Sequence, residues 1–221
     1  MSGSIAEGHP SGGHGGAHGS HHALVPASHG AHDLAAKRII TGYGFWIFLL
    51  SDIVMFSAFF ASFSVLRDAT AGGPSGAEIF DLTNTAWETA LLLLSSFTCG
   101  VAFIGAQLKR DSWYYGAMAV TFLLGVGFLV LESLEFADMV SHGYGPGRSA
   151  FLSSFFTLVG CHGIHVTLGL LWLLTMMAQV YAKGYRPDIM RRLLCFSLFW
   201  HALDIIWVAL FTIVYLIGVA T

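Results

Sequence analysis

Eight ionisable residues lie inside long apolar stretches of this sequence, and they are its main candidates for chemistry. All are acids or histidines: Asp52, Glu88, Glu132, Glu135, His162, His165, His201 and Asp204. An unpaired charge in a lipid hydrocarbon core is costly, so an ionisable residue there is a functional candidate by default. The sequence separation of three residues places His162 with His165, and His201 with Asp204, on one helix face each.

Residues of these types support three kinds of chemistry. A histidine on one helix can donate a hydrogen bond to a carboxylate on another, which would satisfy both groups inside a membrane. Histidines and carboxylates on facing helices can also relay protons or bind a metal ion. The alternatives stay open, but we assign the two histidine-containing pairs to an interhelical polar network and expect the pair His201 and Asp204 to be satisfied by the preceding helix.

The four other acids are predicted to be proton-related or lipid-binding residues. Asp52 stands alone in its stretch, and we expect it to be protonated at neutral pH unless a histidine pairs with it, because burial disfavours the charged form. Glu88, Glu132 and Glu135 are expected to lie together. We predict no catalytic residue and no metal site in this chain.

The elements that position these residues are five apolar stretches. Hydrophobic residues make up 55% of the 221 residues and charged residues 10%, against about 25% charged residues in a typical soluble domain. Each stretch can cross a hydrocarbon core about 30 Å thick. They lack the alternation of a barrel strand, so we predict an all-α, polytopic membrane protein. The predicted spans are 43–66, 86–108, 113–136, 150–180 and 193–219.

The distribution of lysine and arginine predicts the orientation of these spans. Basic residues accumulate in cytoplasmic connections. With five spans, one side receives eight of them: Lys37, Arg38, Lys109, Arg110, Lys183, Arg186, Arg191 and Arg192. The other side receives only Arg67 and Arg148. We therefore expect a cytoplasmic amino terminus and a periplasmic carboxyl terminus, which places the three glutamates in the outer third and the other five candidates in a central layer.

The amino-terminal segment differs from the rest of the chain. Seven of the eleven histidines and many Gly, Ser and Ala residues fall within the first 35 positions, and such a segment cannot bury enough apolar surface to order itself. We predict a disordered cytoplasmic tail over residues 1–36 and a membrane bundle over 37–221. The net charge of −3 without a basic stripe argues against nucleic-acid binding.

Smaller residues inside the spans are interpreted as packing positions. The cysteines at 99, 161 and 195 show no CxxC spacing, so we expect small buried hydrophobic side chains and not a disulfide or zinc site. Close helix packing explains the intramembrane glycines better than a phosphate-binding loop does. These glycines are Gly100, Gly105, Gly125, Gly127, Gly160, Gly163 and Gly169.

Several stretches together resemble a known family. The chain from Gly42 to Gly218 is similar to subunit III of the haem-copper respiratory oxidases. Four stretches carry the resemblance: GFWIFLLSDIVMFSAFF, LESLEF, FFTLVGCHGIHVTLGLLW and SLFWHALDIIWVALFTIVYLIG. Five spans, in place of the seven of many cytochrome c oxidase members, are typical of the quinol-oxidising branch. The connections TAGGPSGAEIFDL and HGYGPGRSAFLSSFF resemble those of the cytochrome o (bo3-type) ubiquinol oxidases.

The resemblance implies an accessory subunit of a proton-pumping ubiquinol oxidase in the bacterial inner membrane. Haem and copper would belong to subunit I, this chain would hold no redox centre, and its partners would be subunits I, II and IV and membrane phospholipids. Packing on subunit I, stabilising the complex, and supporting proton uptake and lipid binding are the implied roles. Asp52 would occupy the position of an intramembrane glutamate. The alternatives are a stand-alone proton channel or transporter, disfavoured because no inverted repeat is evident, and a membrane metalloenzyme.

Overall fold

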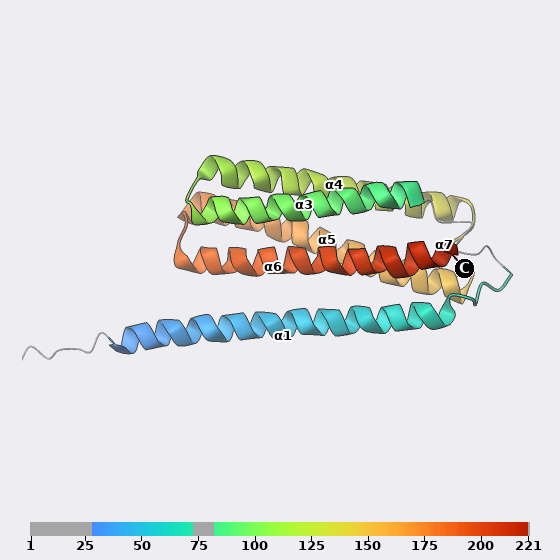
Figure 1. Ribbon diagram of the computed structural model, residues 1–221, viewed down its shortest axis with the longest axis horizontal. Helices are drawn as coiled ribbons and strands as arrows, with labels where there is room; N and C mark the ends of the chain where they lie inside the picture. Colours follow the sequence, from blue (N-terminus) through green and yellow to red (C-terminus); the bar gives the residue numbers. More distant parts are fainter. Residues whose placement is uncertain (1–27, 73–81, 221) are drawn as a thin grey trace, which may run out of the picture. The chain divides into compact units, whose positions relative to one another are not determined.

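The structure, a computed structural model, describes residues 28–72 and 82–220. All regular structure within these residues is helical (Figure 1). The helices are α1 (Ser28–Leu66), α3 (Leu82–Gln107), α4 (Asp111–Ser141), α5 (Ala150–Lys183), α6 (Pro187–Leu210), the π-helical segment η1 (Phe211–Leu216) and α7 (Ile217–Ala220). Five stretches are long and apolar enough to cross a membrane: Gly42–Leu66, Leu82–Gln107, Asp111–Ser141, Ala150–Lys183 and Pro187–Leu216. The all-α, five-span prediction is confirmed.

The span boundaries follow local signals at the helix ends. α5 begins after Ser149, whose side chain accepts a hydrogen bond from the Leu152 amide at 3.1 Å. It ends at Gly184, which has the positive φ of +68° that glycine adopts without strain. Pro187 opens α6 six residues before the predicted start at 193, because a proline suits the first helical position.

The chain divides into two compact units, Met1–Ile39 and Ile40–Thr221. In the first unit only residues 28–39 are described, and they are helical. α1 therefore begins inside the segment that we assigned to a tail ending at residue 36. Residues 1–27, with most of the predicted tail, lie outside the described residues, so the disordered tail stays a prediction.

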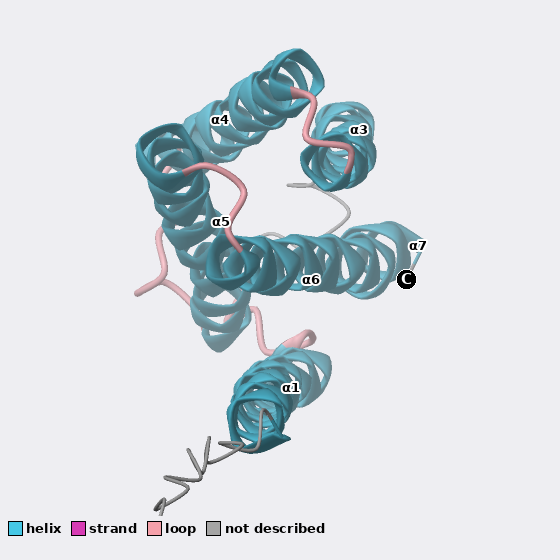
Figure 2. Cartoon of the chain, turned by 90° about the vertical axis from the view of Figure 1, so that its left-hand side faces the viewer, coloured by secondary structure: helices cyan, strands magenta, loops and turns pink. Residues whose placement is uncertain are grey.

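Four helices of the second unit form a closed arrangement. α3 packs on α4, α4 on α5, α5 on α6, and α6 returns to contact α3 (Figure 2). The part of α1 within this unit contacts α5 and α6 through aromatic rings. The centroids of Phe45 and Trp172 are 6.1 Å apart, and those of Phe48 and Phe199 are 6.3 Å apart. Antiparallel neighbours thus bring the acids and histidines of different spans to similar depths.

Some of the predicted packing glycines permit close helix contacts. A Cβ added at Gly125 or Gly169 would lie 2.9 Å from the nearest atom, and both positions face the ring of Trp200. Of the seven, four would place an added Cβ 3.0 Å or less from another atom: Gly105, Gly125, Gly163 and Gly169. At Gly127 and Gly160 the nearest atom would be at 3.7 and 3.8 Å, and at Gly100 no atom lies within 4 Å. Close packing within this chain is therefore confirmed for four positions, whereas Gly100 has no close neighbour in the chain.

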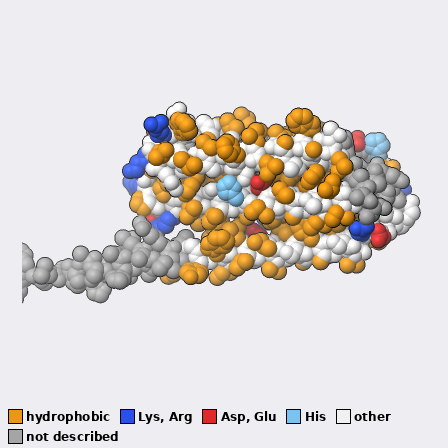
Figure 3. All heavy atoms as spheres, viewed as in Figure 1, with side chains coloured by type: hydrophobic (Ala, Val, Ile, Leu, Met, Phe, Trp, Pro, Cys, Tyr) orange, Lys and Arg blue, Asp and Glu red, His pale blue; other side chains and the backbone are white. Residues whose placement is uncertain are grey.

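The surface agrees with a membrane location. Hydrophobic side chains cover most of the visible length of the helices, and lysine and arginine side chains gather mainly at the end that carries the α3–α4 and α5–α6 connections (Figure 3). Large apolar side chains such as Phe97, Leu123 and Ile205 are two-thirds exposed or more within the chain. Apolar surface of this extent needs lipid or another subunit to cover it.

Candidate functional site

Three carboxyl groups meet near one end of the bundle. Glu88 of α3 interacts electrostatically with Glu135 of α4, and Glu132 of α4 interacts with both. Glu88 is 1% and Glu132 5% exposed. Both carboxyl oxygens of Glu88, and Oε2 of Glu132, have no hydrogen-bond partner within the described part of the chain. The expectation that these three acids lie together is met, and we call them the carboxyl cluster.

Two further residues shape the carboxyl cluster: one that the sequence did not single out and one that it predicted only as a packing glycine. Tyr215 of η1 is buried and interacts electrostatically with all three carboxyl groups. A π-helical turn shifts the side chains that follow it, and such turns often occur at functional sites. Gly163 of α5 gives Glu132 room, because an added Cβ would lie 2.9 Å from Glu132 Oε1. A tyrosine in an apolar run carries no pattern that would have marked it in advance.

A hollow of about 500 Å³ adjoins the carboxyl cluster. Its polar lining comes from Asn84, Glu88, Glu135 and the exposed Asp138 near the end of α4. Like charges close together and burial in an apolar surrounding both disfavour ionisation of a carboxyl group. The arrangement can therefore hold protons and exchange them with water that enters the hollow.

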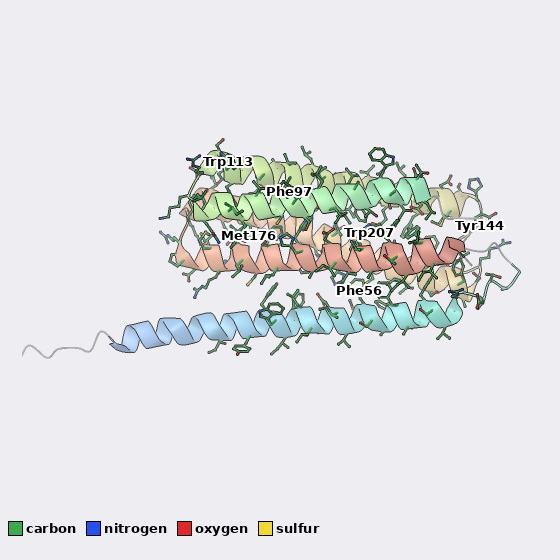
Figure 4. The ribbon with its side chains drawn as sticks, viewed as in Figure 1. Phe56, Phe97, Trp113, Tyr144, Met176 and Trp207 are labelled. Carbon is green, nitrogen blue, oxygen red and sulfur yellow. The ribbon has the colours of Figure 1, made fainter. Side chains whose placement is uncertain are left out.

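His162 lies in an aromatic surrounding at the centre of the bundle. It is fully buried, and its ring centroid is 6.3 Å from that of Phe56, 5.8 Å from Phe128 and 5.1 Å from Trp207. Figure 4 marks Phe56 on α1 and Trp207 on α6, and Phe128 belongs to α4, so three helices supply these rings. Neither ring nitrogen has a hydrogen-bond partner among the described residues. The expected hydrogen bond from His162 to a carboxylate is absent from this part of the structure, because apolar rings surround the imidazole.

His165 is satisfied within its own helix. Its Nδ1 lies 2.8 Å from the carbonyl oxygen of Cys161, and its ring packs against Phe56 at 5.3 Å. Asp52 of α1 is partly buried and interacts electrostatically with His165. The structure thus brings these two residues of the predicted central layer together across α1 and α5.

His201 and Asp204 contact α3 and not, as expected, α5. His201 Nδ1 lies 2.6 Å from the hydroxyl oxygen of Ser96, and Asp204 lies beside the same residue. The shared face that we inferred from their spacing is therefore real, but the neighbouring helix was wrong. The physical reason is that the indole rings of α6 occupy the side of that helix facing α4 and α5.

Two further hydrogen bonds join α6 to α3. The indole Nε1 of Trp200 donates to Ser95 Oγ, and that of Trp207 donates to Thr89 Oγ1, both at 3.1 Å. Together with Ser96 they form a polar seam along the contact between the two helices. Hydroxyl and indole groups satisfy one another inside a membrane, where water cannot.

Within the described residues, no group of three or more His, Cys, Asp or Glu side chains could hold a metal ion. The three cysteines are free. Cys99 is buried, as expected, whereas Cys161 and Cys195 are only partly buried.

Comparison with known proteins shows the family to which the chain belongs. Residues 23–219 match the family described as cytochrome c oxidase subunit III. The chain is 48% identical to cytochrome bo(3) ubiquinol oxidase subunit 3 of Pseudomonas aeruginosa over 188 residues, which are 85% of this chain and 88% of the relative. It is 43% identical to quinol oxidase subunit 3 of Bacillus subtilis, with 79% and 86% covered. It is 42% identical to cytochrome c oxidase subunit 3 of Bacillus sp. strain PS3, with 79% and 84% covered. With five membrane-spanning helices and a match over nearly its whole length, the chain belongs to the cytochrome c oxidase subunit III family.

Proposed function

We propose that this chain is subunit III of a ubiquinol oxidase in the bacterial inner membrane, with its amino terminus in the cytoplasm. The observation that carries the proposal is the 48% identity to two bo(3) ubiquinol oxidase subunits, over 85% and 81% of this chain. The eight-to-two distribution of basic residues supports the orientation.

In this assembly the chain acts without a redox centre of its own. Haem and copper belong to subunit I, and subunits I, II and IV are the protein partners. The large apolar surface of the helices supports a role in packing on subunit I and stabilising the complex.

Purification from membranes in a mild detergent through a tag on this chain tests the proposal. We expect haem-containing subunits to co-purify and the eluate to oxidise ubiquinol with consumption of oxygen. The chain expressed alone should show no haem absorption. Recovery of the chain without haem proteins, together with proton flux in vesicles that hold only this chain, would instead support a channel.

Phospholipid binding is proposed at the end with the basic connections. A hollow of about 580 Å³ is lined by Gly44, Phe45, Trp172, Asp188, Arg191, Arg192 and Cys195. Arginine guanidinium groups suit a lipid phosphate, and the aromatic rings suit the start of the acyl chains. We expect native mass spectrometry to show retention of phosphatidylglycerol over phosphatidylcholine, and Arg192→Gln to reduce that preference. Equal retention of both lipids by the parent would contradict the assignment.

The carboxyl cluster is proposed to hold exchangeable protons. Within the described residues Glu88 and Glu132 are buried and form no ion pair, and burial favours the neutral form of a carboxyl group. In infrared spectra we expect Glu132→Gln to remove part of the carbonyl band of protonated carboxyl groups, and that band to shift in D₂O. Asp138→Asn, which changes an exposed acid beside the same hollow, should leave the band unchanged. An unchanged band in Glu132→Gln would mean that this carboxyl is ionised.

A further inference from the structure

The side of the bundle formed by α3 and α6 carries a polar group in an otherwise apolar surface. A shallow hollow of about 430 Å³ is lined by Leu93, Ser96, Phe97, Gly100, Val101, Ile104, His201 and Asp204. Figure 3 views this side and shows a histidine and an acidic side chain together among hydrophobic atoms. We call these lining residues the α3–α6 face.

The polar group is a chain of three side chains with unused hydrogen-bonding capacity. Ser96 Oγ lies 2.6 Å from His201 Nδ1, so the one hydrogen between them can be donated by either residue, and Asp204 lies beside the same hydroxyl. Either direction leaves His201 Nε2 without a hydrogen bond in the described part of the chain. Asp204 Oδ1 is also without a partner there. A hydroxyl or amide group can bond to His201 Nε2 whether that nitrogen carries a hydrogen or not, because such a group both donates and accepts hydrogen bonds.

The position of this group excludes water as its ordinary partner. Ser96 and His201 lie near the middle of the spans Leu82–Gln107 and Pro187–Leu216. Lipid acyl chains at that depth offer no hydrogen bond, so polar groups there are usually satisfied by another helix.

The shape of the face suits a helix. Gly100 lies one turn after Ser96, and nothing in the chain lies within 4 Å of a Cβ added there. Phe97 and Ile104 beside it are 68% and 55% exposed. A small residue between large exposed ones lets a second helix approach closely.

We propose that the α3–α6 face is the docking surface for a transmembrane helix of another oxidase subunit, which presents a hydroxyl or amide side chain to the Ser96–His201–Asp204 group. The inference rests on the proposed function, because it requires a partner subunit within the same membrane complex.

Photo-crosslinking in the purified oxidase tests which face is covered. A benzophenone amino acid replaces Phe97, and in a control it replaces Leu123 of α4, which has nearly the same exposure (68% and 67%). We expect the probe at 97 to link to a transmembrane subunit of the oxidase, and the probe at 123 to link to lipid. The proposal would be overturned if the probe at 97 linked to lipid or quinone and to no protein subunit. It would also be overturned if the probe at 123, and not the probe at 97, linked to a subunit.

A pair of glycine-to-leucine variants tests the same contact, because a large side chain at the docking surface would keep a partner helix from approaching. Gly100→Leu fills space that is open in this chain, whereas Gly116→Leu does so at an exposed position of α4. We expect Gly100→Leu to lower retention of this subunit, relative to haem, by about tenfold after a detergent wash that the parent withstands. Gly116→Leu should be retained like the parent. Equal retention of both variants would contradict docking at this face.

The two proposals fail in different ways. If no haem-containing subunit co-purifies with the parent chain, the proposed function is wrong and the face remains without a partner. If haem-containing subunits co-purify but the probe at 97 does not reach them, only the choice of face is wrong.

Discussion

A methyl group added at Gly169 should destabilise the bundle. Its Cβ would lie 2.9 Å from Cζ3 and 3.2 Å from Cε3 of the Trp200 ring, and 3.3 Å from the Phe199 ring. The indole has little room to retreat. Across the ring, the position of a Cβ at Gly125 is 3.2 Å from Trp200 Cη2, and Nε1 is held by Ser95 at 3.1 Å. Gly169→Ala therefore forces α5 and α6 apart.

The expected magnitude follows from two opposing effects. Overpacking of a close-packed core costs about 1–3 kcal/mol. Replacing glycine by alanine inside a helix contributes about 1 kcal/mol in the other direction. Gly116→Ala shares the second effect only, since no atom lies within 4 Å of its added Cβ. The difference in free energy of unfolding between Gly169→Ala and Gly116→Ala should thus be about 1–3 kcal/mol.

Reversible unfolding in mixed micelles, by titration with a denaturing detergent, measures this difference. Trp200→Phe supplies the second arm of a double-mutant cycle, because the smaller ring withdraws the atoms that the methyl would meet. In that background the cost of Gly169→Ala should shrink. If Gly169→Ala is as stable as Gly116→Ala, the close approach of α5 to Trp200 is wrong. If it is destabilised equally in both backgrounds, the indole ring is not the cause.

Three further outcomes are expected. Thr89→Ala should lower the free energy of unfolding by about 1–3 kcal/mol, because it leaves the buried Trp207 Nε1–H without its acceptor, and it should cost much less in a Trp207→Phe background. Burial and the hydrogen bond to Asp111 raise the pKa of Tyr185, so the folded protein keeps the phenol proton at pH values above the ordinary pKa near 10. The free energy of unfolding therefore falls as the pH rises beyond about 10. In alkaline unfolding, Tyr185→Phe should lose less stability with rising pH than the parent. Asp52→Asn should assemble normally, and its oxidase in liposomes should lose sustained activity as pH rises, where proton supply is most limiting; an unchanged pH profile would limit Asp52 to a structural role.

The spans and the carboxyl cluster could be predicted from the sequence, because the spans depend only on hydropathy and the cluster only on depth along each helix. Hydropathy over about 20 residues sets where a helix crosses the membrane, and the rise along the helix sets depth, which was enough to bring Glu88 to the level of Glu132 and Glu135. Tyr215 was not accessible. It lies in the π-helical segment η1, and no residue type within Phe211–Leu216 encodes that segment locally.

The partner of His201 depended on rotation about the helix axis, and that is set by the largest side chains. Trp200 and Trp207 lie two turns apart and therefore on one face of α6. Close packing of Trp200 on Gly125 and Gly169 holds that face toward α4 and α5. Successive residues turn by about 100°, so His201 comes to the rim of the bundle beside α3. The same packing that buries the tryptophans leaves the imidazole half open to a neighbour, and a polar group therefore lies at mid-membrane on the outside of this chain.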